Sequence, residues 1–205
     1  MSMLSQSDRD RIAAAIQVAE RTTSGEIVVL VAARAGAYRS VALLIALLCG
    51  LVVPWPLIFA TQWSAASIVL MQAIVVLAAL LATLHPAARL ALVPRAIRRE
   101  RAHDAAMREF ASRGVTRTRG HTGILIYVAV AEGHAEIVAD SAVAGRVPVE
   151  TWSGVIDDLL GSLRRNKAAE GLVGAVGRVG AILAAELPGS PDDTDELPNR
   201  VIVVE

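Results

Sequence analysis

The side chains best suited to chemistry in this 205-residue sequence belong to several acidic residues and to one polar loop. The possible acids are Glu26, Glu132, Glu136 and Asp140, and the loop that could meet an anion contains Thr116, Arg117, Arg119 and His121. Hydrolysis of a phosphate ester needs a nucleophile or a metal beside charge-neutralising donors, and these residue types could supply them. Glu136 and Asp140 are four positions apart, so within one strand they would share a face.

Two sets of candidate site residues follow from these types and spacings. The candidate catalytic residues are Glu26, Glu136, Asp140 and Arg119, and the candidate ligand-binding residues are Thr116, Arg117 and His121. Glu26 can join the other acids only if its strand is a neighbour of theirs. The alternative is that all of them are solvated strand ends and a salt-linked loop.

Neither the histidines nor the cysteine forms a recognisable metal or redox motif. The histidines are His85, His103, His121 and His134, and they lack HExxH or a similar zinc-site spacing. Cys49 is the single cysteine, which excludes an internal disulfide framework. Twenty Lys and Arg balance twenty Asp and Glu, which argues against a basic nucleic-acid-binding surface. We therefore predict no metal site, no cofactor and no nucleic-acid partner.

Four glycines recur at every third position near the end of the chain: Gly171, Gly174, Gly177 and Gly180. A phosphate-loop interpretation fails because no Gly-Lys-Ser/Thr follows, and because a nucleotide-binding fingerprint opens a helix rather than running through one. Each glycine inside a helix costs about 1 kcal/mol relative to alanine. We expect close backbone packing on the sheet to offset this cost.

The apolar residues, 54% of the chain, are concentrated in two runs that contain no charged residue, residues 41–60 and 65–84. A helix rises about 1.5 Å per residue, so each run can cross the roughly 30 Å hydrocarbon core of a bilayer. Only residues 61–64 separate the runs, and Pro54 and Pro56 bend the end of the first. The sequence therefore predicts a two-helix transmembrane hairpin, in preference to a buried hairpin or a cleaved signal peptide.

Gln72 is the one amide inside a predicted span. An amide in hydrocarbon commonly forms a hydrogen bond between helices. Because Gln72 has no ionisable neighbour in the spans, we do not assign it to a transport site.

The distribution of positive charge predicts the orientation of the hairpin. Arginines precede the first span, none lies in the turn, and Arg95, Arg98, Arg99 and Arg101 follow the second span. By the positive-inside rule both ends are cytoplasmic. We predict a multi-pass protein of the inner membrane, with both termini and the water-soluble part cytoplasmic. The four arginines are predicted to lie at the lipid surface, each contributing roughly 1 kcal/mol near anionic lipid.

The residues before the hairpin predict a helix and a buried strand. Ser5 can cap the helix, with Asp8 as its capping-box partner. The apolar face of this helix contains Ile12, Ile16 and Ala19. Residues 26–32, EIVVLVA, predict a strand that is buried on both faces. A lone strand is not stable, so it must pair with strands from beyond the hairpin, which makes the hairpin an insertion within a domain.

The residues after the hairpin complete this domain. We predict a helix at 94–112, strands at 123–131 and 135–140, and helices at 150–165 and 168–187. Residues 188–205 begin as a disordered acidic tail and end in VIVV, which can either dock or stay free.

These elements define the fold class and the domain boundaries. Residues 1–39 supply the first helix and strand, 41–84 the hairpin, 94–187 the remainder of the domain and 188–205 the tail. The order of elements predicts an α/β sandwich with helices packed on a short central sheet.

Two blocks of sequence resemble the TPM domain family. LSQSDRDRIAAAIQVAERTTSGEIVVLVA is similar to the first helix and strand of the family, and FASRGVTRTRGHTGILIYVAVAEGHAEIVADSAVAGRVP to its second and third strands and the following loop. The hairpin looks like that of a bacterial, membrane-inserted subgroup. The resemblance implies a TPM-like α/β/α sandwich, here interrupted by the transmembrane hairpin.

The resemblance also implies weak acid-phosphatase activity and calcium binding for some members, and partner binding or assembly for others. Many relatives place an acidic turn before the second strand, where this chain has His121-Thr122-Gly123. A Gly-Tyr-Gly stretch after the third strand is replaced by Asp140-Ser141-Ala142. Both departures argue against a calcium or phosphatase role.

We therefore expect a non-catalytic, membrane-anchored binding, assembly or quality-control factor whose partners are the lipid bilayer and other membrane proteins. A weak phosphatase-like hydrolase is the first alternative. A small oligomeric transporter component is the second, and it is weaker because the two spans carry one amide and no charge. The sequence does not define an oligomeric state.

Overall fold

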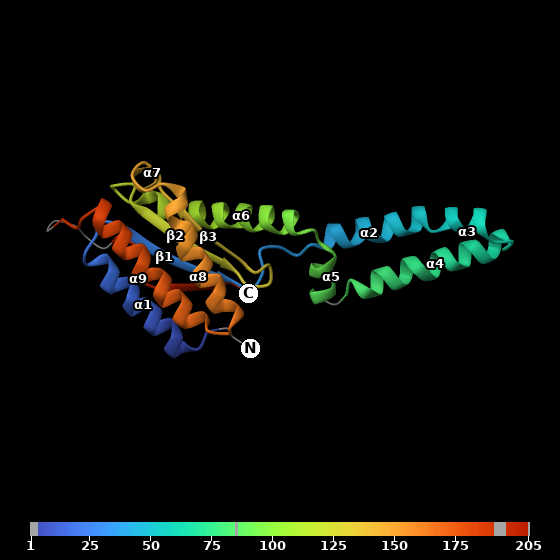
Figure 1. The fold of residues 1–205 in the computed structure, drawn as a ribbon, viewed down its shortest axis with the longest axis horizontal. Helices are drawn as coiled ribbons and strands as arrows, with labels where there is room; N and C mark the ends of the chain where they lie inside the picture. Colours follow the sequence, from blue (N-terminus) through green and yellow to red (C-terminus); the bar gives the residue numbers. More distant parts are fainter. Residues whose placement is uncertain (1–3, 85, 191–195, 205) are drawn as a thin grey trace. The chain divides into compact units, whose positions relative to one another are not determined.

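The computed structural model describes residues 4–84, 86–190 and 196–204 (Figure 1). The chain divides into two compact units: Met1–Ala35 together with Arg99–Glu205, and Gly36–Arg98. The first unit is an α/β domain and the second is helical, so the helical unit interrupts the domain in sequence.

The sheet of the α/β domain has four strands in the order β3-β2-β1-β4. These strands are β1 (Glu26–Ala32), β2 (Gly123–Ala129), β3 (His134–Ala139) and β4 (Val201–Val204). β1 is parallel to β2 and β4, whereas β3 is antiparallel to β2. Every residue of β1 and β2 is buried, as expected for apolar strands that are covered on both faces. The prediction that β1 pairs with a strand from beyond the hairpin is confirmed.

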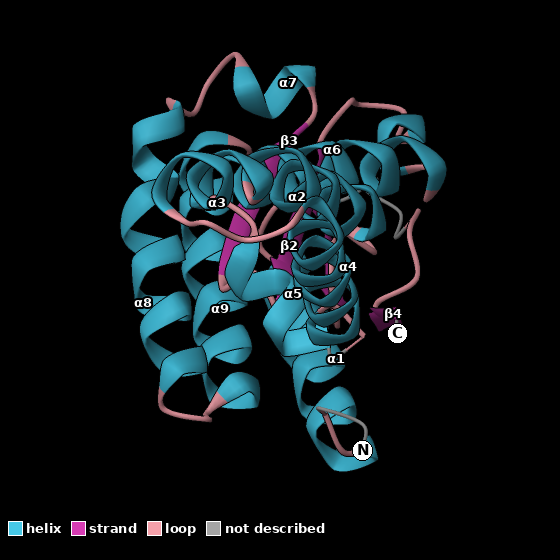
Figure 2. Cartoon of the chain, turned by 90° about the vertical axis from the view of Figure 1, so that its right-hand side faces the viewer, coloured by secondary structure: helices cyan, strands magenta, loops and turns pink. Residues whose placement is uncertain are grey.

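Helices cover both faces of the sheet. One face is covered by α1 (Gln6–Glu20), α8 (Ser153–Arg164) and α9 (Ala168–Glu186), which pack side by side (Figures 1 and 2). α6 (Arg95–Ser112) covers the other face through Ala102, Ala105, Ala106 and Phe110. Residues 27, 29 and 31 of β1 point to the first face and residues 28, 30 and 32 to the second, as the alternation of a strand requires. The predicted α/β/α fold is confirmed.

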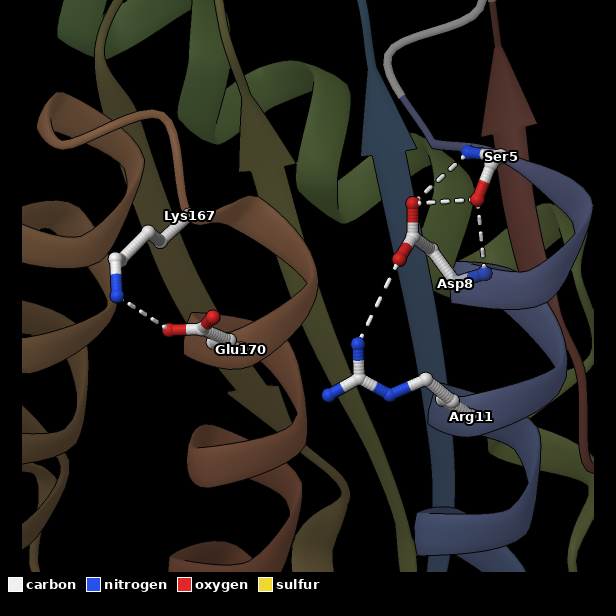
Figure 3. Close-up of polar contacts among 5 residues, drawn as sticks. All are labelled: Ser5, Asp8, Arg11, Lys167 and Glu170. Atoms are coloured by element: carbon white, nitrogen blue, oxygen red, sulfur yellow. Dashed lines mark hydrogen bonds and ion pairs between the residues drawn. The ribbon is translucent and has the colours of Figure 1, made fainter.

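A capping box opens α1, as predicted (Figure 3). The Asp8 backbone N–H donates to Ser5 Oγ at 3.1 Å. In return, Asp8 Oδ2 accepts from the Ser5 backbone N–H at 3.1 Å and from its hydroxyl at 2.7 Å. The hydrogen bond with Ser5 lowers the pKa of the Asp8 carboxyl below its ordinary value. Ile12, Ile16 and Ala19 of α1 are buried, so the predicted apolar face is confirmed.

Several predicted boundaries require correction. β2 ends at Ala129 rather than at residue 131, and β3 begins at His134 and ends at Ala139. The turn between them needs the additional residues, with Gly133 in the left-handed region at φ 60°. The helix predicted at 150–165 is a short 3-10 segment, Val149–Trp152, followed by α8.

The C-terminal VIVV segment docks on the sheet as β4 instead of staying free. Its register pairs Val29 with Val201 and Ala32 with Val204. Most of the acidic part of the predicted tail, residues 191–195, lies outside the described residues. Residues 201–204 are therefore part of the domain.

The glycine series of α9 divides into packed and open positions. A Cβ on Gly171 would lie 2.6 Å from Ser162 Cβ of α8, and a Cβ on Gly180 would lie 2.6 Å from Ala19 Cβ of α1. A Cβ on Gly174 or Gly177 would meet nothing within 4 Å. The two outer glycines are closely packed, but against the helices α8 and α1 rather than on the sheet as predicted, and the two inner glycines are open. Nine residues turn a helix by about 180°, so the outer glycines face neighbours on opposite sides of α9.

The helical unit is a hairpin followed by a short helix. It consists of α2 (Arg39–Val52), α3 (Pro54–Ala60), α4 (Ala65–Ala82) and α5 (Pro86–Leu92). The first arm is divided at Val53, directly before Pro54, because proline cannot continue the backbone hydrogen-bond ladder. α2 and α4 pack against each other, and Gln72 Nε2 donates to the Gly50 carbonyl oxygen at 2.8 Å. The predicted interhelical role of Gln72 is confirmed.

Within the described part of the chain, three helical stretches are long and apolar enough to cross a membrane. Two of them, Leu43–Ala60 and Ala65–Ala82, are the arms of the hairpin, and only 6% of each is buried. The third, Ala168–Glu186, is α9, of which 39% is buried because it packs in the α/β domain. Exposed apolar surface therefore distinguishes the hairpin as the segment suited to lipid.

Candidate functional site

Polar residues gather at the end of the sheet where β1 and β2 begin. Glu26 is paired with Gly123 in the register of the two strands, and the Glu26 N–H donates to the Thr122 carbonyl oxygen at 3.2 Å. On the other side of β2, the Asp140 N–H donates to the Gly123 carbonyl oxygen at 2.9 Å. Glu26 and Asp140 therefore lie at the same end of the sheet, on either side of β2.

The Glu26 carboxylate is buried and holds the C-terminal segment. Its side chain accepts from the backbone N–H of Glu196 through Oε1 and from that of Leu197 through Oε2, each at 3.2 Å. Glu26 is 7% exposed. The two amides lie four to five residues before β4, so the carboxylate anchors the approach of this strand to the sheet.

Asp140 fixes the loop that follows β3. Its Oδ1 accepts from the Ser141 N–H at 2.6 Å and so caps α7 (Ser141–Ala144). The His121 ring N–H donates to Asp140 Oδ2 at 3.3 Å, and the Ala142 N–H donates to the His121 carbonyl oxygen at 3.1 Å. These bonds tie the loop before β2 to the loop after β3.

The predicted anion-binding loop is ordered by contacts within the domain. Thr116 and Arg117 are exposed and belong to a 3-10 turn, Val115–Arg117. The Arg119 N–H donates to Glu196 at 2.9 Å, while its guanidinium lies 3.9 Å from the same carboxylate and is 88% exposed. Arg119 is therefore positioned by its backbone, and its cationic group extends into solvent.

Glu136 lies apart from the other candidate acids. It stands opposite Tyr127 in the middle of the β2–β3 pair, about 13 Å along the strand from Asp140 at about 3.3 Å per residue. His103 of α6 donates to Glu136 Oε1 at 2.6 Å, and His134 donates to Oε2 at 3.2 Å. The structure thus brings Glu26, Asp140 and Arg119 to one end of the sheet and places Glu136 in a separate cluster with two histidines.

Two titratable groups on this part of the sheet have shifted pKa values. Burial raises the pKa of Glu136, but the hydrogen bonds from His134 and His103 outweigh it and leave the pKa of this carboxyl below its ordinary value. Burial raises the pKa of the adjacent Tyr127 phenol to about 12. Glu136 is consequently held as a hydrogen-bonded carboxylate and Tyr127 as a neutral phenol near neutral pH.

The sequence did not identify several residues that build these clusters. Thr118 is buried and its Oγ1 accepts from the Thr122 N–H at 3.1 Å, which closes the loop before β2. Glu196 lies in the predicted tail, and His103 lies on a helix whose partner strand is distant in sequence. Among the described residues, no group of three or more His, Cys, Asp and Glu has the geometry to hold a metal ion.

The four arginines predicted at the lipid surface lie in the first two turns of α6. Arg95 and Arg99 are exposed, and Arg98 and Arg101 are half-buried. Arg95, Arg98 and Arg99 share one face of the helix by their i, i+3 and i+4 spacing. In the chain they follow α5, the short helix that comes after the hairpin.

Comparisons with known proteins identify one family and one fold relative. A family model described as TPM domain matches residues 75–182, a segment that includes α6, β2, β3 and α8. The chain is similar in fold to the NMR structure of BA42 protein from the psychrophilic bacterium Bizionia argentinensis, with a TM-score of 0.61 and 21% identity. That likeness covers 98% of this chain and 94% of BA42. No curated protein matches the sequence.

Proposed function

The chain belongs to the TPM domain family, and from this premise we propose that it is a membrane-anchored member whose cytoplasmic domain binds, assembles or controls the quality of other membrane proteins without catalysing a reaction. The observation that carries the proposal is that the candidate catalytic acids already form hydrogen bonds within the domain. Glu26 holds the C-terminal segment, Asp140 caps α7, and Glu136 binds two histidines.

Engaged carboxylates are poorly suited to catalysis. A general base must reach a substrate proton within hydrogen-bond distance, and a nucleophile must be exposed to the reacting atom. The Glu26 oxygens already accept backbone amides, and Glu26 is 7% exposed. Releasing it for chemistry would detach the segment that leads into β4, so a structural role for this carboxylate is favoured.

The hairpin supports the membrane anchor. Both of its long arms expose apolar side chains over nearly their whole length, which water would disfavour and a bilayer would accommodate. Arginines flank the arms and none lies in the turn, which favours insertion in the inner membrane with both ends cytoplasmic. In this orientation Arg95 and Arg99 lie within reach of anionic lipid headgroups.

The orientation can be tested by cysteine labelling. In a Cys49→Ser background, Gln62→Cys places a thiol in the turn and Arg164→Cys places one on α8 of the domain. We expect a membrane-impermeant maleimide to label position 62, but not position 164, from the periplasmic side. Labelling of position 164 but not of position 62 from the periplasmic side would reverse the orientation, and labelling of both positions from the cytoplasmic side alone would contradict insertion of the hairpin.

The binding role can be tested by purification of the full chain in a mild detergent. We expect one membrane protein to be recovered in a stoichiometric amount. Gly123→Ala is a control, because its Cβ would overlap the Val115 carbonyl oxygen and disrupt the domain while leaving the hairpin intact. Loss of the partner in this variant would place binding on the domain. Recovery of lipid alone under several growth conditions would refute the proposal.

A weak phosphatase-like hydrolase is the second candidate, supported by the position of Glu26, Asp140 and Arg119 at one end of the sheet. Hydrolysis of a generic phosphate ester by the purified chain would support it if Asp140→Asn abolishes the rate. Asparagine keeps the cap of α7 and removes the charge, so the fold is retained. An unchanged rate in this variant would exclude Asp140 from the chemistry.

A further inference from the structure

An open groove of about 490 Å³ runs along one face of α4. Its lining residues are Val69, Gln72, Ala73, Val76, Leu77 and Leu80. Gln72 is the polar residue among them, and the others are aliphatic. Gln72 and Val76 lie beside Gly50 of α2, so the groove adjoins the contact between α2 and α4. Val69, Ala73 and Leu77 are exposed and have the i, i+4, i+8 spacing of a helix face that can receive another helix.

The Gln72 amide has hydrogen-bonding capacity to spare. A glutamine amide carries two N–H donors and a carbonyl oxygen that accepts. Among the described residues, its side chain makes one hydrogen bond, in which Nε2 donates to the Gly50 carbonyl oxygen. One N–H and the carbonyl oxygen remain. In the hydrocarbon core no water can satisfy them, so they favour a protein partner.

The partner that fits these two groups is a second Gln72. The spare N–H of one amide can donate to the carbonyl oxygen of the other, and the reverse bond forms at the same time. Two copies inserted in the same orientation place Gln72 at the same depth, so a two-fold axis along the membrane normal brings the amides together. Ala73 beside it is small enough to let the two helices approach closely.

We propose that two copies of this chain pair in the membrane through α4, with their Gln72 amides hydrogen-bonded to each other. The inference rests on the proposed insertion of the hairpin. It adds a partner, a second copy, that is independent of any protein bound by the α/β domain. Lipid chains could fill the groove but could not bond to the amide.

The first test measures self-association of the full chain in detergent micelles by sedimentation equilibrium. Hydrogen bonds between polar side chains stabilise pairs of helices in membranes. Gln72→Leu should therefore raise the dissociation constant of the dimer roughly 5- to 30-fold. Gln62→Leu makes the same chemical change in the turn and should leave the dissociation constant unchanged. A monomeric parent chain, or equal effects of the two substitutions, would overturn the proposal.

The second test does not depend on losing the Gly50 bond. In a Cys49→Ser background, Ala73→Cys places a thiol beside the groove, and Ala78→Cys places one about 140° around α4. Both alanines are exposed in the single chain. Oxidation in native membranes should cross-link position 73, but not position 78, into a species twice the 21.5 kDa mass of the chain.

The outcomes separate this inference from the proposed function. A cross-link at position 73 to a different protein would assign the groove to that protein and overturn self-pairing. Efficient labelling of Gln62→Cys from the periplasmic side, together with no cross-link at position 73, would retain the membrane anchor and refute the dimer. Absence of insertion would refute both.

Discussion

Replacing Glu26 with glutamine should loosen the C-terminal strand. Each Glu26 carboxylate oxygen accepts one backbone N–H, from Glu196 or Leu197, at 3.2 Å. In glutamine one oxygen becomes an NH2 group, which cannot accept, so one bond is lost and the other no longer ends on a charge. Hydrogen bonds to charged groups contribute about 1.5–3 kcal/mol, and these two are longer than the strongest ones. We therefore expect a loss of about 2 kcal/mol in the free energy of opening β4.

Hydrogen exchange of the intact chain in detergent measures this loss. About 2 kcal/mol corresponds to roughly 30-fold faster exchange of the β4 amides if β4 opens locally. The β2 amides, which bond to β1 and β3, should keep their rates. Glu170→Gln is a matched control, because Glu170 is exposed and paired with Lys167 at 3.1 Å (Figure 3). Such a surface pair contributes a few tenths of a kcal/mol, so exchange in β4 should not change.

Two results would refute this reasoning. If β4 exchanges at the parent rate in Glu26→Gln, the carboxylate does not hold the segment. If β2 and β4 accelerate together, Glu26 stabilises the whole domain and β4 does not open as a separate unit.

Three further predictions concern stability, each measured by denaturant unfolding of the full chain. Gly180→Ala should lower the free energy of unfolding by about 1–2 kcal/mol, because the new methyl group would lie 2.6 Å from Ala19 Cβ. Gly177→Ala, at an open position, should raise it by about 1 kcal/mol. Equal effects of the two substitutions would contradict the packing of α9. Ser5→Ala should cost about 1 kcal/mol through loss of the cap, and no change would show that α1 forms without it. The pKa of Glu136 lies below its ordinary value of 4.5, so its stabilisation is present above pH 4.5 and is lost as the pH falls through the lowered pKa. Glu136→Gln should flatten this acid dependence, and an unaltered pH profile would count against the histidine contacts.

Local patterns were sufficient to predict much of the fold. The EIVVLVA segment predicted a strand covered on both faces, and its need for neighbours predicted that the hairpin interrupts a domain. Ser5 and Asp8 predicted the start of α1, because a capping box involves only residues three positions apart. These features depend on short-range sequence, so no knowledge of the tertiary structure was needed.

The contacts that build the candidate site join segments that are distant in the chain. A four-residue apolar run has too little periodicity to show whether it docks, so the sequence does not define the position of β4. The bond from Glu26 to Leu197 crosses nearly the whole sequence. Likewise, the bond between His103 and Glu136 depends on the rotation of α6 above β3, which sequence spacing does not define.

The prediction that all four glycines of α9 pack closely failed for a geometric reason. A period of three turns a helix by about 300° per step, so successive glycines move around the axis and cannot all face one neighbour. α9 lies between α1 and α8, and only Gly171 and Gly180 meet those helices. Composition predicted that packing occurs, but the positions of the neighbours determine which glycine it involves.

Because the hairpin interrupts the domain, the neighbouring strands β1 and β2 are synthesised at different times. The ribosome completes β1 before the hairpin, whereas β2, its seven-residue partner, emerges only after residues 33–122 have been made. At about 5–20 residues per second this interval lasts roughly 5–20 s. During that time an apolar strand with two open edges is available to associate with other nascent chains. Prompt delivery of the hairpin to the bilayer, or a chaperone on the emerging chain, would therefore determine the yield of folded protein.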